Sequence, residues 1–259
     1  MLRKLHDPAK GRLRVVALMS GSGTNLQKVL EHQQALAASR GEAPYEVVAI
    51  FSDRSDSNAA DIGKQYDIPV VTHDIRGFYE KRGLPRKDMS VRADFDRQTV
   101  DMLKPFNANV AVYAGYMSIA TPPLIKAYMG INVHPADLSV VENGKRKWTG
   151  DYAVRDAIVA GEKYIYSTTH MVSPEVDAGR IFMISAPLEV EVPENPDFSI
   201  QKVRREIRLH NQDRLKEAGD WVIMPRTIEY IADGRFAEDE NGVMHVDGEP
   251  IPGGLRLSL

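Results

Sequence analysis

The sequence contains no cysteine, and this absence removes several classes of chemistry at once. Disulfide bonds, catalysis by a thiolate, and zinc or iron–sulfur sites with cysteine ligands are all excluded. A chain without cysteine also suits the reducing conditions of the cytoplasm, where we expect the protein to be located.

Neither an excess of positive charge nor a long apolar run is present. The chain of 259 residues has 33 Lys and Arg against 36 Asp and Glu, so its net charge is −3. Dedicated binders of nucleic acid or of anionic membranes are usually basic, and we expect neither partner. No run of about 18 apolar residues could form a transmembrane helix. Residues 1–12 lack the apolar core of a signal peptide.

Metal-binding and serine-hydrolase motifs are absent as well. The seven histidines are scattered, without a His-x-His or His-Glu-x-x-His pair, so we expect no metal site. No Gly-x-Ser-x-Gly segment marks the nucleophile of a serine hydrolase. The remaining chemistry is that of asparagine, histidine and aspartate side chains, which can stabilise an oxyanion and move protons.

The first half of the chain alternates apolar strands with amphipathic helices. Between these helices, buried strands are expected at residues 14–19, 46–52, 69–72, 109–114 and 130–133. This alternation predicts an α/β fold with a doubly wound, mostly parallel sheet and helices on both faces. Within this half, Ser90 should cap a helix that ends at Pro105.

From about residue 164 the pattern changes. Two strands that are close in sequence should pair antiparallel, and two helices and a terminal hairpin should follow. The expected ranges are 166–172 and 181–187 for the strands, and 197–217 and 221–232 for the helices. The second half therefore differs in architecture from the first.

A glycine-rich loop, Ser20–Asn25, links the first expected strand to the first helix. In an open parallel sheet, ligands bind at the carboxyl ends of strands, and the free N–H groups of a helix start favour an anion. Glycines let a phosphate approach the backbone, and short polar side chains add donors. The candidate phosphate-binding residues are Gly21, Ser22, Gly23, Thr24 and Asn25. A tight turn without a ligand is the alternative interpretation.

The same loop does not match two well-defined nucleotide motifs. A P-loop would end in Gly-Lys-Ser or Gly-Lys-Thr, but here Thr24 follows Gly23 and no lysine is present. The dinucleotide fingerprint needs a third glycine where Leu26 stands. Asp53, after the second strand, could still hold a ribose, so an oxidoreductase with a nucleotide cofactor remains an alternative.

Asn132 and His134 stand at the end of the strand expected at 130–133. Side chains two residues apart point to the same side of a strand, and polar groups on an apolar strand need partners or a ligand. His170 and Asp177 form a second polar set, with Asp177 on an expected tight loop. The alternative is a hydrogen-bonded core histidine, a structural His170 and an ordinary loop acid.

Five segments resemble the glycinamide ribonucleotide transformylases, a family of folate-dependent formyltransferases in purine biosynthesis. The segments are Ser20–Gln27, Ala114–Met117, Asn132–Pro135, Val176–Gly179 and Ala232–Arg235. Their order and rough spacing are kept from about residue 13 to the end. The asparagine, histidine and aspartate are shared by all 10-formyltetrahydrofolate formyltransferases and the related deformylase, whereas the phosphate loop points to this family.

The resemblance implies a Rossmann-like formyltransferase fold in a single domain, residues 1–259. Residues 13–135 would be a phosphate-binding half, and residues 136–259 would complete the folate and catalytic site. The enzyme would transfer the formyl group of the cosubstrate 10-formyltetrahydrofolate to the amine of glycinamide ribonucleotide, without a metal. A homodimer is considered as its assembly.

The resemblance also assigns roles to individual side chains. Asn132 would donate to the developing oxyanion, His134 would share that task or move a proton, and Asp177 would hold His134 and a proton-carrying water. His170 would support these groups from behind or be structural. The residues that would bind folate are Arg92, Met117, Ser118, Ile119 and Ala120. For Arg92, an exposed helix charge is the alternative.

The chain departs from the family's pattern around the acceptor. Residues 136–149 lack the usual Ser-Leu-Leu-Pro and Pro-Gly segments, and residues 140–147 could be a mobile lid or a solvated charged loop. The family's Gln-x-x-Glu corresponds to Glu217 and Asp220, our candidates for binding the acceptor. Deformylation of formyltetrahydrofolate, formylation of another phosphorylated amine, and a non-catalytic ligand-binding module remain alternatives.

Overall fold

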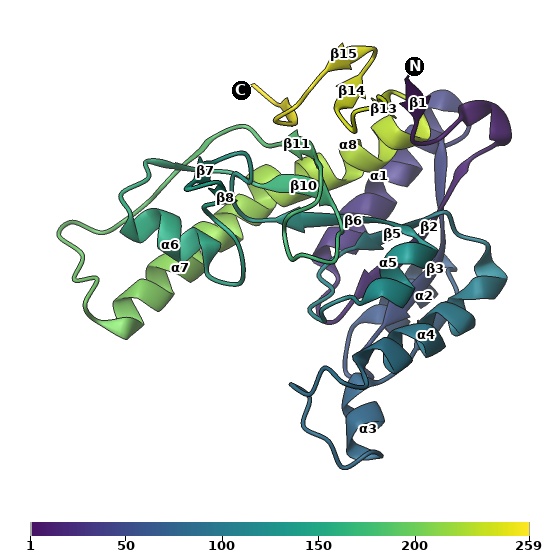
Figure 1. Ribbon diagram of the computed structural model, residues 1–259, viewed down its shortest axis with the longest axis horizontal. Helices are drawn as coiled ribbons and strands as arrows, with labels where there is room; N and C mark the ends of the chain where they lie inside the picture. The colour runs from purple at the N-terminus through teal and green to yellow at the C-terminus, as the bar shows by residue number, and fades with distance from the viewer. Residues whose placement is uncertain (1, 259) are drawn as a thin grey trace.

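The structure, a computed structural model, describes residues 2–258 and is built around one large sheet (Figure 1). In spatial order its strands are β16 (Leu255–Arg256), β11 (Ile181–Ile184), β10 (Thr168–Met171), β6 (Met129–His134), β5 (Val110–Tyr113), β2 (Leu13–Met19), β3 (Tyr45–Ser52) and β4 (Val70–Thr72). From β4 to β6 all neighbours are parallel, whereas β10 is antiparallel to β6 and to β11. This confirms the expected mostly parallel sheet with an antiparallel C-terminal part.

Helices and three smaller sheets surround the large sheet. The helices are α1 (Thr24–Arg40), α2 (Ala59–Tyr66), α3 (Ile75–Glu80), α4 (Arg92–Leu103), α5 (Pro122–Ala127), α6 (Ala153–Val159), α7 (Gln201–Leu215) and α8 (Trp221–Ala232), with 3-10 turns at Pro8–Lys10 and Lys104–Phe106 and a π-helix at Lys216–Asp220. The smaller sheets are β1 (Arg3–Lys4) with β13 (Phe236–Glu238), β14 (Met244–Val246) and β15 (Glu249–Pro250); β7 (Val141–Glu142) with β8 (Lys145–Arg146); and β9 (Tyr164–Ile165) with β12 (Leu188–Glu189). Among residues 2–258, no helix has the length and apolar character that crossing a membrane requires.

Strand β2 is buried on both faces, as a central parallel strand must be. Val15, Ala17 and Met19 belong to one core cluster, which also contains residues of α1 and α8. Val16 and Leu18 belong to the opposite cluster, which contains residues of α3, α4 and α5. Two helical layers therefore cover the sheet from opposite sides (Figure 1).

A third core cluster lies away from the parallel strands, where α6 and α7 extend from the sheet (Figure 1). Trp148 packs there with apolar residues of both helices, among them Ala153 and Ile207. Ala136 and Trp148 belong to this cluster, so the chain that follows β6 is packed against α6 and α7.

The start of α4 differs from the sequence-based expectation. Val91 occupies the N-cap position and no described side chain caps the helix, so the prediction that Ser90 caps it was wrong. The Ser90 N–H instead donates to the Asp88 carboxylate at 2.9 Å, a local turn that competes with helix capping. The preceding helix α3 was not predicted, and Asp74 caps it by accepting from the Arg76 and Gly77 N–H groups at 2.9 Å and 3.0 Å.

The two helices expected in the C-terminal half form one continuous rod. α7 ends at Leu215, the π-helical segment follows at once, and α8 begins at Trp221 (Figure 1). Pro225 lies inside α8 and cannot donate a hydrogen bond to the carbonyl four residues earlier. A wide π turn just before such a position is one way for a helix to continue without a break.

Candidate active site

Asn132 and His134 project from the carboxyl end of β6, beside the antiparallel neighbour β10. In the register of this pair, Asn132 lies opposite His170 and His134 lies opposite Thr168. The Asn132 amide nitrogen is 3.3 Å from Nε2 of His170. Asn132 and His134 both line one cavity, which is described below.

Asp177 reaches both histidines from the loop between β10 and β11. Its backbone is left-handed, with φ of 55°, and its side chain is buried. One carboxylate oxygen lies 3.4 Å from Nδ1 of His134 and accepts a hydrogen bond of 2.9 Å from the Gly150 N–H. The other oxygen lies 3.6 Å from Nε2 of His170. A single carboxylate thus bridges two imidazole rings.

Backbone carbonyls fix the tautomers of the two histidines, because a carbonyl oxygen can only accept a hydrogen bond. Nε2 of His134 donates to the Trp148 carbonyl at 2.9 Å. Nδ1 of His170 donates to the Met171 carbonyl at 3.0 Å. Burial lowers the pKa of both histidines, although the Asp177 carboxylate opposes this effect. A neutral His134 therefore presents an unprotonated Nδ1 beside Asp177, a position that can receive a proton.

An open cavity of about 590 Å³ lies beside these groups and collects most of the residues singled out in the sequence. The candidates in its wall are Asn25, Met117, Ser118, Ile119, Ala120, Asn132, His134, His170, Asp177 and Asp220. Among the described residues, those outside its wall are Gly21, Ser22, Gly23, Thr24, Arg92 and Glu217. The cavity therefore joins both halves of the chain.

The glycine loop ends at Gly23, whose φ of 74° is left-handed, directly before α1. A Cβ atom at this position would lie 2.4 Å from the end of the Ile62 side chain and 2.9 Å from that of Met19, and the left-handed φ would strain any other residue, so both features favour glycine here. None of the described side chains caps α1, and the first N–H groups of a helix have no intrahelical partner. These groups, beside the Asn25 side chain, can bind an anion.

Ser20 ties the glycine loop to the loop that follows β5. Its N–H donates to the Gly115 carbonyl at 3.1 Å, and its hydroxyl accepts from the Met117 N–H at 2.9 Å. Met117 and Ile119 are 71% and 52% exposed, so the second loop offers apolar surface to a ligand. The two candidate substrate loops are therefore held side by side.

Ser118 connects this loop to a buried aspartate. Its hydroxyl donates to the Asp53 carboxylate and accepts a hydrogen bond of 3.0 Å from Arg86. Asp53 is fully buried by these contacts. It does not present its carboxylate to the cavity, as a ribose-binding acid of a nucleotide-cofactor oxidoreductase would.

Arg92 is buried, so the alternative of an exposed helix charge was wrong. Its guanidinium lies 5.6 Å and 5.7 Å from the ring centres of Tyr79 and Phe95. Within residues 2–258, its Nε and Nη1 atoms have no hydrogen-bond partner. Buried donors in this state favour an anionic group or ordered water as a partner.

The α7–α8 rod contributes to the cavity in a way that the sequence did not indicate. Arg208, Gln212 and Lys216 line the cavity together with Asp220, whereas Glu217 is exposed. Their spacing of four residues is the signal for one helix face, but sequence alone did not show which face meets the site.

Asp220 is held inside by two partners. It accepts a hydrogen bond of 2.5 Å from the Ser167 hydroxyl and another from the Asn25 side chain. Burial raises the pKa of Asp220 to about 6, although these bonds and the Lys216 charge oppose the shift. Asp220 therefore contacts the glycine loop directly.

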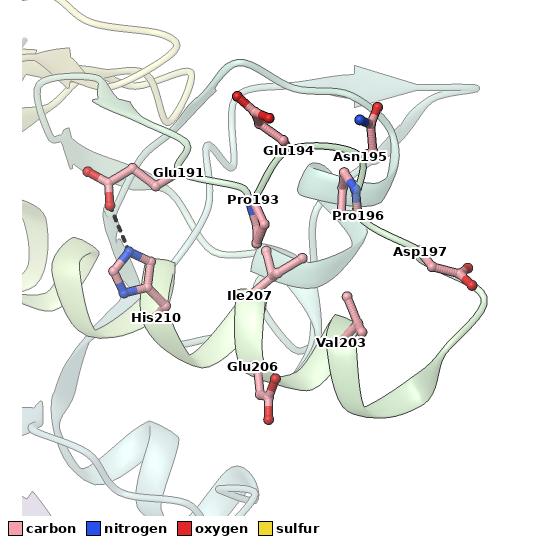
Figure 2. A pocket seen from close by; sticks show the side chains of 10 residues that line it. All are labelled: Glu191, Pro193, Glu194, Asn195, Pro196, Asp197, Val203, Glu206, Ile207 and His210. Atoms are coloured by element: carbon pink, nitrogen blue, oxygen red, sulfur yellow. Dashed lines mark hydrogen bonds and ion pairs between the residues drawn. The ribbon is translucent and has the colours of Figure 1, made fainter.

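A second hollow of about 410 Å³ lies between the chain at residues 191–197 and α7 (Figure 2). Glu191 and His210 pair across part of it at 2.7 Å. The carboxylates of Glu194 and Glu206 point away from each other in Figure 2, so they do not converge on a ligand. Among the described residues, no cluster of three or more histidine or acidic side chains could hold a metal ion.

The chain is similar to known formyltransferases in sequence and in structure. The pattern of the Formyl transferase family matches residues 13–213. A phosphoribosylglycinamide formyltransferase of Haemophilus influenzae is 29% identical over 92% of this chain and 96% of its own length, and that of Escherichia coli is 25% identical over 93% and 96%. The solved phosphoribosylglycinamide formyltransferase of Coxiella burnetii, in complex with CHES, superimposes with a TM-score of 0.68 at 25% identity, over 95% of this chain and 99% of its own.

Proposed function

The chain belongs to the formyl transferase family, and we propose that it transfers the formyl group of 10-formyltetrahydrofolate to the amine of glycinamide ribonucleotide in de novo purine biosynthesis. One observation carries this proposal: Asn132, His134 and Asp177 meet in the wall of a cavity that also contains Asn25 of the glycine loop. The two bacterial relatives are phosphoribosylglycinamide formyltransferases, which supports glycinamide ribonucleotide as the acceptor.

The cavity has a suitable end for each substrate. The acceptor phosphate would bind the N–H groups at the start of α1 and the residues Gly21–Asn25. The folate would lie against Met117–Ala120, where apolar side chains are exposed. Arg92 is buried and lies outside the cavity wall, so we assign it no direct contact with folate. Asp220 would hold the Asn25 side chain in place at the end of the cavity that binds the acceptor.

The reaction joins the acceptor nitrogen to the formyl carbon and then breaks the bond between that carbon and N10 of the folate. As the amine attacks, the formyl oxygen gains negative charge, and the Asn132 amide would donate to it. Such a donor is worth about 2.7–4 kcal/mol of barrier. The amine must also lose a proton, which would pass to Nδ1 of His134 and finally to N10.

Of the two roles considered for His134, the hydrogen bonds favour proton transfer over oxyanion donation. Its Nε2–H is engaged by the Trp148 carbonyl, so it is not free for an oxyanion. Its Nδ1 faces the Asp177 carboxylate, which would stabilise the imidazolium that forms. General acid–base catalysis of this kind contributes about 10²–10⁴-fold. His170 would support Asn132 and Asp177 from behind.

The direct test measures formyl transfer from 10-formyltetrahydrofolate to glycinamide ribonucleotide by purified protein. We expect formylated product and tetrahydrofolate in equal amounts. Parallel reactions omit the acceptor or replace it with other phosphorylated amines. Formate released without acceptor would indicate a deformylase. If only another phosphorylated amine is formylated, that amine is the acceptor in place of glycinamide ribonucleotide. Folded protein that turns over none of them would refute the proposal.

Two broader properties belong to the same proposal. We place the reaction in the cytoplasm, which the absence of cysteine supports. We also propose one domain whose halves, 13–135 and 136–259, build the site together, with a homodimer as the assembly to be tested by sedimentation.

A further inference from the structure

The segment from Arg146 to Gly150 contacts the catalytic groups with every second residue. The Arg146 guanidinium donates to the carbonyls of Asp177 and of Gly179, the latter at 2.7 Å. The Trp148 carbonyl accepts from His134, and the Gly150 N–H donates to the Asp177 carboxylate. Three alternate residues of one short segment thus contact His134 or the loop that carries Asp177.

The segment is itself held firmly on both sides. Arg146 ends the β7–β8 hairpin, whose turn residues Asn143 and Gly144 have the positive φ of a two-residue hairpin turn. Trp148 is buried in the α6–α7 core cluster. Residues 140–147 therefore form an anchored hairpin, and Arg146 is directed at the site from a fixed base.

The loop that carries Asp177 needs such support. Asp177 has a left-handed backbone, which residues with a Cβ atom adopt at a cost. Gly179 lies so close to β10 that a Cβ atom would be 1.7 Å from the Met171 carbonyl oxygen. The Arg146 guanidinium donates to the two carbonyls on either side of Ala178, and these two hydrogen bonds hold the turn in its shape.

We propose that Arg146 is a positioning residue: its guanidinium fixes the Asp177 loop, and so places the Asp177 carboxylate between His134 and His170. The kinetic part of the test below rests on the formyl transfer proposed above, whereas the hydrogen-exchange part does not. Arg146 touches backbone carbonyls of the loop, so it acts through Asp177.

The Arg146 charge also acts on the proton acceptor. The charged groups that face His134 are the Asp177 and Asp151 carboxylates and the Arg146 guanidinium, and His170 lies across Asp177. The positive charge of Arg146 contributes to the lowered pKa of His134. Removal of this charge alone should therefore raise the pKa of His134.

The experiment compares wild type with Arg146→Ala, Arg146→Lys and the control Lys145→Ala, whose side chain is exposed on the same strand. Misplacement of a catalytic group by about 1 Å can cost about 10²-fold in rate. We expect Arg146→Ala to lower kcat by about 10²-fold, with both KM values changed by less than about threefold. The acidic limb of its pH profile should move to higher pH.

Arg146→Lys separates the geometry from the charge. A lysine keeps the positive charge but has no planar fork to span two carbonyls. We expect its kcat to stay well below wild type while its acidic limb keeps the wild-type position. If Arg146→Ala does not fold, Arg146→Lys provides the same comparison of kcat and loop order. An Arg146 variant with wild-type kcat, or a Lys145→Ala with an equal loss, would overturn the proposal.

Hydrogen exchange of the amides at 177–179 measures the loop without any turnover. We expect faster exchange in both Arg146 variants and unchanged exchange in Lys145→Ala. If the wild-type protein transfers no formyl group, the proposed function fails, but faster exchange confined to the Arg146 variants still supports this inference. Equal exchange in all four proteins overturns it.

Discussion

At the scale of single residues, Asp177 is a buried carboxylate that lies close to two histidine rings. Its carboxylate lies 3.4 Å from His134 and 3.6 Å from His170, and both rings are buried. We expect Asp177→Asn to lower kcat by about 10²–10⁴-fold, because the imidazolium formed at His134 loses its counter-charge. Asparagine has the same shape and tolerates a left-handed backbone, so the fold should survive.

Steady-state kinetics and a thermal unfolding midpoint check this prediction together. Asp151→Asn is the matched control, because Asp151 also lines the cavity and acts on His134 by charge, yet it is exposed. Its kcat should change little. A kcat for Asp177→Asn within about tenfold of wild type would remove Asp177 from the proton transfer.

Asn132 contributes a neutral donor. Its amide nitrogen now contacts Nε2 of His170, which accepts because its other nitrogen donates to a carbonyl. We expect Asn132→Ala to lower kcat by about 10²–10³-fold with little change in folate KM, as loss of an oxyanion donor does. Asn132→Asp has nearly the same shape but repels an oxyanion, so its loss should be at least as large. Wild-type kcat in either variant would contradict the assigned role.

At the scale of elements, the α7–α8 rod forms the end of the cavity that we propose for the acceptor, through its π turn. The five-residue segment Lys216–Asp220 turns Lys216 and Asp220 inward and leaves Glu217 in solvent. π turns inserted in α-helices are frequent at functional sites. The polar contacts of Asp220 with Ser167 and Asn25 hold this turn against β10 and α1.

The buried Asp220 gives this turn a pH dependence that can be measured. Its pKa in the folded chain is about 6, above the ordinary value of 3.8, because burial disfavours the charge. A raised pKa means stability that is present below pH 3.8 and lost as the pH rises through about 6. At about 1.36 kcal/mol per pH unit, wild type should lose about 3 kcal/mol relative to Asp220→Asn across that window.

Urea unfolding of wild type and Asp220→Asn at pH values from about 4 to 7 checks this difference. Asn can still accept from the Ser167 hydroxyl, so the variant retains one of the two bonds. The comparison cancels the titration of His134 and His170, which both proteins share. A constant difference in unfolding free energy over the window would show that Asp220 does not titrate there.

Several strands and two of the site residues could be predicted from the sequence. Apolar runs predicted β2, β3 and β5 because parallel strands buried on both faces need continuous apolar side chains. Asn132 and His134 were found because polar groups at the end of such a strand are unusual. Their closeness to Asp177 could not follow from spacing, since it depends on the antiparallel pairing of β6 with β10.

Arg146 and Trp148 escaped prediction for a different physical reason. Both meet the site through backbone carbonyls: Arg146 donates to carbonyls about thirty residues away, and the Trp148 carbonyl accepts from His134. Every residue carries a carbonyl, so such contacts leave no pattern in side-chain types. Glu217 was chosen because it corresponds to the first residue of the family's Gln-x-x-Glu, and in the structure it is exposed within the π-helical segment.

At the scale of the whole molecule, the site lies where the sheet changes direction. β6 ends the run of parallel neighbours that begins at β4, and it pairs antiparallel with β10 on its other side. Asn25, Asn132 and His134 come from residues 13–135, whereas His170, Asp177 and Asp220 come from residues 136–259. A ligand in this cavity therefore touches both halves, and its binding energy should stabilise both together.

This argument predicts a single unfolding transition that both substrates shift. With glycinamide ribonucleotide and a non-reactive folate each near 100 times its Kd, either ligand should add about 2.7 kcal/mol to the unfolding free energy. For a chain of this size, that corresponds to a rise of about 5–10 °C in Tm for each ligand. Differential scanning calorimetry measures it, with the ribonucleoside that lacks the phosphate as the matched control, for which the rise should be much smaller because the glycine loop is left empty. Two separate transitions, of which a ligand moves only one, would mean that the halves are independent domains and that the cavity does not join them.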